Sequence, residues 1–151
     1  MRQTLAWSGA VGLAVVLAIQ FIPTARTNPP TTREVRWSNP ATRALATRAC
    51  FDCHSNDTVW PWYSHVAPAS WLVINHVVDG RLHLNFSEWD KPQRATFTDV
   101  EENVTRGDMP IWNYVMLHPL AKLTPAETAA LVDGLRATLL HDPPIPRPRQ
   151  R

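Results

Sequence analysis

The chain has 151 residues, of which 44% are hydrophobic and 19% are charged, as in a folded protein with an apolar core. Its formal net charge of +2 is too small to favour nucleic acid as a partner. It contains two cysteines, so a zinc site closed by two cysteine pairs is excluded. One ordinary domain is therefore expected.

The chain begins with an apolar segment. No charged residue lies between Thr4 and Ile22, and a helix of this length would measure about 28 Å, close to the thickness of the hydrocarbon core of a bilayer. We expect residues 1–22 to form a single transmembrane helix, and the lack of an A-x-A pattern after it favours an uncleaved anchor over a signal peptide. Consecutive prolines then predict an extended linker over 23–36.

The globular part is expected over 37–142, and it starts with a helix. Asn39 and Pro40 are the residue types of an N-cap and of a first helical position. This helix would lead into the most informative run of the chain, Cys50-Phe51-Asp52-Cys53-His54. Helical spacing would direct both thiols and the imidazole of this run toward one planar ligand.

The run Cys50–His54 is typical of an attachment site for a c-type haem. Cys50 and Cys53 would form thioether bonds with the porphyrin, and His54 would be the proximal iron ligand. The alternatives are a redox dithiol, a structural disulfide and half of a zinc site. No βαβ pattern surrounds the cysteines, as a thioredoxin-like dithiol would require.

The haem motif also predicts a compartment. Covalent haem is attached on the outer side of energy-transducing membranes. Together with the N-terminal segment, this predicts a protein of the bacterial inner membrane whose haem domain lies in the periplasm.

Two features follow the motif. The aromatic side chains of Trp60, Trp62 and Tyr63 suit either a wall of the haem pocket or the packing of the core. A helix is then predicted from Pro68 to Asp79, with Gly80 as its stop.

Two further helices are indicated by their capping residues. The run Thr98–Glu101 has capping-box spacing for a helix that ends at Gly107. The run Thr124–Glu127 starts the last helix, which repeats leucine at every fourth position and stops at Asp142. No long stretch alternates with a period of two, so the predicted fold class is all-α, with the Pro/Arg-rich residues 143–151 as a solvated tail.

The sixth ligand of the iron would decide the function. Met109, in the loop Gly107–Pro110, is the first candidate, because a thioether ligand raises the reduction potential and closes the iron to substrates. The alternatives are Met116, His118 and His76, or an open position. A lone methionine or histidine is also commonly a packing or hydrogen-bonded residue.

Several separated motifs carry a family resemblance. They are Cys50–Asn56, Trp60–Ser64, Ala67–Trp71, His83–Trp89, Gly107–Pro110 and His118–Pro119. With them, the chain from Asn28 to its last helix resembles the bacterial haem-binding domain family, small anchored proteins related to monohaem cytochromes c. The resemblance implies a cytochrome c-like helical domain around one covalent haem c, an N-terminal anchor and an extracytoplasmic location. It implies no haem role for Leu84–Trp89, which we interpret as structural, with Ser87 capping a turn and Phe86 and Trp89 packing.

Two functional hypotheses follow. A one-electron carrier would use His54 and Met109 as axial ligands and would exchange electrons with redox partner proteins. A peroxidase-like enzyme, or a sensor of gas or redox state, would keep the sixth position open or displaceable, with His118 or His76 as a distal acid or base. No phosphate-binding loop, Ser/His/Asp order or zinc signature is present in the sequence, so the carrier is favoured over the enzyme.

Overall fold

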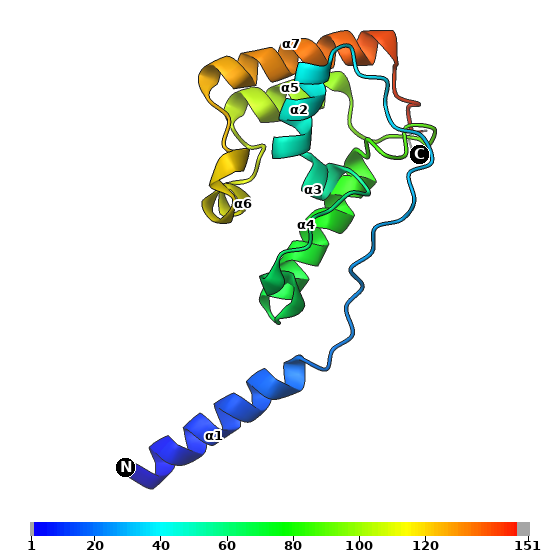
Figure 1. The fold of residues 1–151 in the computed structure, drawn as a ribbon. Coiled ribbons are helices and arrows are strands. Elements are labelled where there is room, and N and C mark those ends of the chain that lie inside the picture. Colours follow the sequence, from blue (N-terminus) through cyan, green and yellow to red (C-terminus); the bar gives the residue numbers. More distant parts are fainter. Residues whose placement is uncertain (1, 148–151) are drawn as a thin grey trace. The chain divides into compact units, whose positions relative to one another are not determined.

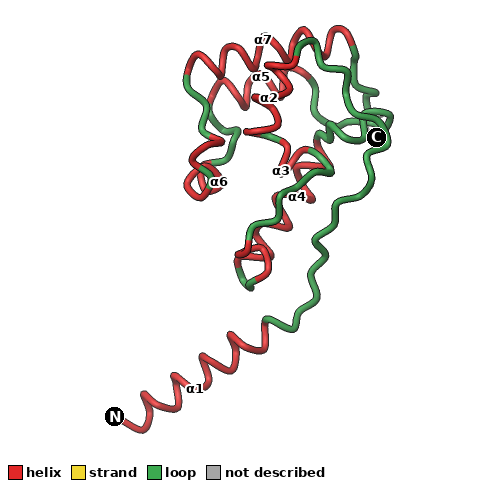
Figure 2. The backbone as a smooth tube through the Cα atoms, viewed as in Figure 1, coloured by secondary structure: helices red, strands yellow, loops and turns green. Residues whose placement is uncertain are grey.

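A computed structural model of the chain describes residues 2–147, which form seven α-helices and two short 3₁₀ helices. The α-helices are α1 Arg2–Ile19, α2 Pro40–Ala49, α3 Phe51–His54, α4 Ala69–His83, α5 Phe97–Arg106, α6 Trp112–Leu117 and α7 Pro125–His141, and the 3₁₀ helices are η1 Trp62–His65 and η2 Pro119–Ala121 (Figure 1). Within the described residues, β structure is limited to two isolated bridges, and Figure 2 shows helices joined by loops. The predicted all-α class is confirmed.

The chain forms two compact units. The first contains the residues up to Thr27 together with Trp60–His76, and the second contains Asn28–Val59 and the residues from Val77 on. In the first unit, the side-chain amide of Gln20 exchanges two hydrogen bonds with the main chain of Ala67, at 2.9 and 3.1 Å. The second unit holds the hydrophobic core and the motif Cys50–His54.

The N-terminal segment differs from its prediction. It forms α1, which ends at Ile19, three residues before the expected end of the span. Gln20, Phe21 and Ile22 donate to carbonyls three positions earlier instead of four, and Pro23, which has no N–H, cannot extend the helix further. Among the described residues, no helix is both long and apolar enough to cross a membrane. The expected helix is confirmed, and the expected transmembrane span is not.

The predicted starts of α2 and α7 are confirmed. The side chain of Asn39 accepts a hydrogen bond from the N–H of Thr42 at 2.8 Å, with Pro40 in the first turn. At α7, the hydroxyl of Thr124 accepts from the N–H of Glu127, and the carboxylate of Glu127 accepts from the N–H of Thr124 in return. Both caps satisfy amides that have no partner within the helix.

The start of α5 differs from its prediction. Its N-cap is Thr96 rather than Thr98, and the reciprocal carboxylate is that of Asp99. Thr98 therefore lies inside the helix, and the alternative spacing two residues earlier makes the cap. Gly107 ends the helix with a φ of 78°, a left-handed conformation that favours glycine, as predicted.

The core of the second unit lies where α7 packs on α5 and α2 (Figure 1). The leucines at every fourth position of α7, Leu131, Leu135 and Leu139, are all buried, as their spacing predicts. A Cβ atom on Gly134 would collide with the side chain of Thr42, so the absence of a side chain lets α7 and α2 cross closely. Ring contacts continue this core into the neighbouring segments through Trp37, Phe51, Phe86 and Trp89.

Part of the expected linker is hydrogen-bonded to the second unit. The side-chain amide of Asn28 donates to the carbonyl of Thr58 at 2.8 Å, and the main-chain N–H of Val35 donates to the carbonyl of Phe86 at 3.1 Å. Val35 is also buried in the core. The segment from Asn28 on therefore has both polar and apolar partners, although its prolines suggest a solvated spacer.

Asp142 ties the end of α7 to this same segment. Its carboxylate accepts from the N–H of Arg36 at 2.9 Å and forms an ion pair with Arg33, and its carbonyl accepts from the indole of Trp89 at 3.0 Å. Burial works to raise the pKa of Asp142, but the hydrogen bonds from Arg36 and Arg33 outweigh burial and hold this pKa below its ordinary value.

We expect Asp142→Asn to lower the free energy of unfolding by about 2 kcal/mol at neutral pH, because it weakens hydrogen bonds to a charged group. A carboxyl whose pKa is lower in the folded chain stabilises the fold above its unfolded value of about 4, and this contribution is lost as the pH falls through the folded value. The stability difference between the two proteins should therefore shrink from about pH 5 down to about pH 2 in urea unfolding followed by circular dichroism.

The control is Glu102→Gln, which removes an exposed carboxylate and should change the stability by less than about 0.5 kcal/mol. A wild-type advantage over Asp142→Asn that stays constant over the whole pH range would contradict the role given to this carboxylate.

Candidate cofactor site

The cysteine motif lies on a single helical turn with a break before it. Cys50 ends α2 and precedes α3, with a φ of −126°, so the predicted continuous helix is interrupted at this residue. The carbonyl of Cys50 accepts from the N–H groups of Cys53 and His54, at 3.2 and 2.8 Å. The two thiols and the imidazole therefore share one closed turn, as the spacing predicts.

Both cysteines are free and half-buried. Burial raises the pKa of the Cys50 thiol to about 12, and burial together with the charge of Asp52 raises that of Cys53 to about 11. A redox dithiol needs a thiol whose pKa is lowered, because the thiolate is the reactive form. No group of three or more His, Cys, Asp or Glu side chains suited to a metal ion occurs in the part of the chain that the structure describes. Both thiols are thus in the protonated form rather than in the reactive thiolate form.

The imidazole of His54 has a defined tautomer. Its Nδ1 lies 3.0 Å from the carbonyl oxygen of Leu84, and a carbonyl can only accept, so Nδ1 must carry the proton. Burial lowers the pKa of His54 below its ordinary value, although hydrogen bonds to the carbonyls of Leu84 and Gly80 oppose this effect. With Nδ1 donating to Leu84, Nε2 is the ring nitrogen that can bind a metal.

The helix α4 comes very close to the motif. The sequence predicts that Gly80 stops this helix, but α4 continues to His83. A Cβ atom on Gly80 would collide with the main-chain carbonyl of Cys53. The role of this glycine is therefore close approach rather than termination, since any other residue would push α4 away from the cysteine turn.

The chain after α4 holds the end of the motif through hydrogen bonds to both the main chain and the side chain of His54. The N–H of Phe86 donates to the carbonyl of His54 at 2.8 Å, while the His54 ring donates to Leu84. The N–H of Asn56 donates to the hydroxyl of Ser87 at 2.9 Å. These paired contacts fix both the main chain and the ring of His54.

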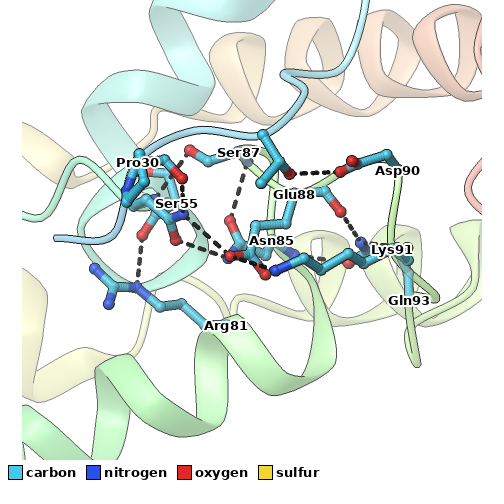
Figure 3. A network of polar contacts seen from close by, with 11 residues as sticks. Pro30, Ser55, Arg81, Asn85, Ser87, Glu88, Asp90, Lys91 and Gln93 are labelled. Carbon is cyan, nitrogen blue, oxygen red and sulfur yellow. Dashed lines mark hydrogen bonds and ion pairs between the residues drawn. The ribbon is translucent and has the colours of Figure 1, made fainter. Parts of the chain in front are cut away.

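A buried polar network supports this arrangement, and Figure 3 shows its members. The side-chain amide of Asn85 donates to that of Asn56 at 2.9 Å, and the N–H of Asn85 donates to the side chain of Gln93 at 2.8 Å. The guanidinium of Arg81 donates to the carbonyl of Ser55 at 2.8 Å. Among the described residues, every buried side-chain nitrogen or oxygen has a hydrogen-bond partner, so the network is fully satisfied.

The stretch Leu84–Trp89 therefore has a role that the sequence reasoning missed. Phe86 and Trp89 pack in the core, as predicted, but Leu84 and Ser87 hold the histidine end of the motif. The sequence offers one signal for this role, which is that the amide residues Asn85 and Gln93 lie close to large apolar residues. Such residues are retained in a core when they fix one arrangement of their neighbours.

A second contact joins the motif to α6, a helix that the sequence reasoning did not predict. The hydroxyl of Tyr114 donates to Oδ2 of Asp52 at 2.7 Å. No residue of α6 is buried, and Trp112, Met116 and Leu117 are exposed apolar side chains. The contact between Tyr114 and Asp52 is therefore a polar link between the motif and a helix that buries no residue.

The predicted axial residues are divided between the two units. Met109 lies in the loop before α6, and its side chain is 37% exposed. Met116 is 65% exposed and lies two positions after Tyr114, which puts it roughly 200° around the helix from the side that contacts the motif. The ring of His118 stacks on that of Tyr114 at a centroid distance of 4.3 Å.

The other predicted site residues belong to the first unit. His76 and Trp60 are half-buried, and Trp62 is exposed and packs edge-on against Tyr63. Their roles as a distal ligand and as a haem wall stay predictions.

The donor set of the second unit fits a haem. It combines two free, protonated thiols, one imidazole whose Nδ1 donates to a carbonyl, and a thioether on the loop before α6. The model of the haem-binding domain family matches residues 14–137. No curated protein and no solved structure matches the chain.

Proposed function

Because the chain belongs to the haem-binding domain family, we propose that it is a one-electron carrier with a covalently attached haem c. Cys50 and Cys53 would hold the porphyrin, and His54 would bind the iron. The proposal depends mainly on one observation. Nδ1 of His54 is hydrogen-bonded to the carbonyl of Leu84, which leaves Nε2 as the atom that would bind the metal.

The haem would supply reversible one-electron chemistry, and the chain would orient it and tune it. The hydrogen bond from His54 to Leu84 increases the basicity of the imidazole as a ligand. The absence of a side chain at Gly80 lets α4 lie against one side of the cysteine turn. Both effects would act on the proximal side of the haem, because both contacts are made by residues of the motif.

Met109 is the sixth ligand that the arrangement favours. It precedes α6 in the chain, and α6 is joined to the motif through Tyr114 and Asp52. Met116 is less suitable, because it lies on the other side of α6 from Tyr114. Ligation by a thioether would raise the reduction potential and keep exogenous molecules off the iron.

The proposed chemistry implies an extracytoplasmic location and a redox partner protein. Haem c is attached to free thiols outside the cytoplasm, and Cys50 and Cys53 are both free. A carrier of single electrons also needs a donor and an acceptor, for which other redox proteins are the natural class.

The second candidate function is a haem enzyme or a sensor with an accessible iron. It is favoured by one observation, the stacking of His118 on Tyr114, because a distal imidazole can act as an acid or a base. The two functions differ in whether an external ligand can reach the iron.

Exposure of the reduced protein to carbon monoxide therefore separates the two functions. We expect the spectrum to stay essentially unchanged over minutes, because the thioether occupies the sixth position, and a redox titration to fit a reversible one-electron step. The measurement combines stopped-flow mixing with spectroelectrochemistry on the full chain. Saturation by carbon monoxide within milliseconds would reject the carrier in favour of the enzyme or sensor.

A further inference from the structure

The hydrogen bond between Tyr114 and Asp52 ties α6 to the cysteine turn. Asp52 stands between the two cysteines, and its other carboxylate oxygen accepts from the N–H of Val59 at 2.9 Å. Tyr114 and Asp52 are both half-buried. A hydrogen bond to an ionised carboxylate is roughly twice as strong as one between neutral groups. This single contact can therefore contribute substantially to holding α6 in place.

The remaining contacts of α6 are shallow. None of its residues is buried, and the helix has six residues. The loop with Met109 leads into it, and His118 follows it and stacks on the Tyr114 ring at an interplanar angle of 17°. In the second unit, the candidate distal residues Met109, Met116 and His118 therefore all belong to one segment, 109–118, at whose centre Tyr114 contacts the motif.

We propose that Tyr114 is a positioning residue, which holds the segment 109–118 against the attachment motif and thereby limits the access of external ligands to the distal side of the haem. The inference rests on the proposed function, since it requires haem at Cys50 and Cys53. Tyr114 itself would bind neither the porphyrin nor the iron. Its hydroxyl would affect ligand access only indirectly, by keeping the segment 109–118 in place.

The test compares the haem-loaded full chain with its Tyr114→Phe variant. Removing a hydrogen bond to a charged group should raise the population of the open segment, and with it the rate of cyanide binding to the ferric haem, by about tenfold or more. Amide hydrogen exchange over 109–118 should accelerate by a similar factor, while exchange in α7 stays unchanged. Trp112→Phe, on the opposite side of the same helix, is the matched control and should leave both rates at the wild-type value.

The double variant Tyr114→Phe/Asp52→Asn tests whether the two side chains act as one unit. If they do, Tyr114→Phe accelerates cyanide binding much less in the Asp52→Asn background than in the wild type, whereas two independent effects would multiply. Wild-type rates in Tyr114→Phe, or a multiplicative double variant, would overturn the inference. A protein that carries no haem would instead reject the proposed function, and the hydrogen exchange of 109–118 would still decide whether Tyr114 holds the segment.

Discussion

Replacing both Cys50 and Cys53 with serine is expected to abolish covalent haem attachment completely. In a host with a haem-attachment system, the wild-type protein should keep its haem through acid-acetone extraction and on denaturing gels, because thioether bonds survive both. The double variant should lose all of its haem under the same treatment. Serine is nearly isosteric with cysteine, so the helical turn and its contact with Gly80 remain.

The single variants make this test quantitative. Cys50→Ser and Cys53→Ser should each retain one thioether bond, and the pyridine haemochrome spectrum of each should shift because one vinyl group stays unsaturated. His54→Ala should lose the proximal ligand, while the matched variant His141→Ala, at the exposed end of α7, should keep the wild-type spectrum. A wild-type protein whose haem is fully extracted by acid-acetone would reject covalent attachment.

The turn that contains the motif and the starts of α2 and α7 were predictable because their information is local. The spacing of Cys50–His54 on one turn, and the caps at Asn39 and Thr124, depend on residues three or four positions apart. Such patterns follow from helix geometry alone. The structure agrees with them except at Cys50, where α2 ends and α3 begins anew.

The residues that the sequence reasoning misread depend on distant partners. Gly80 resembles a helix stop, but its role is set by the carbonyl of Cys53, far away in the chain. Ser87 resembles a local cap, but its hydroxyl accepts from Asn56 after the motif. A periodic pattern cannot show which segment packs against which, so the function of Leu84–Trp89 became visible only in the folded chain.

The helix α6 was missed for a related reason. It has six residues with no side-chain cap, and it buries none of them, so neither a capping signal nor a clear apolar stripe marks it. The N-terminal segment shows the opposite error, in which composition alone suggested a span that α1 does not meet. Both cases concern elements whose large apolar side chains are mostly exposed, so burial could not guide the prediction.

Met109→Ala is expected to remove the sixth ligand of the iron and leave that position open to external ligands. The oxidised wild-type protein should show the near-infrared charge-transfer band from sulfur to iron, and the variant should lose it. Its reduction potential should fall by on the order of 100 mV, within the range of about 0.8 V that axial ligands span, because the thioether favours the reduced iron. Carbon monoxide should then bind rapidly. Since the side chain of Met109 is 37% exposed, the fold should lose less than about 1 kcal/mol.

Met116→Ala is the matched control for Met109→Ala. It removes the same thioether from an exposed position on α6, and it should keep the band, the potential and the resistance to carbon monoxide. Loss of the band in Met116→Ala and its retention in Met109→Ala would reverse the assignment. Absence of the sulfur-to-iron band in the wild-type protein would reject methionine ligation altogether. It would favour His118 as the sixth ligand, or an open sixth position. The distal ligand, which neither the motif nor the proximal packing determines, thus separates a carrier from a catalyst.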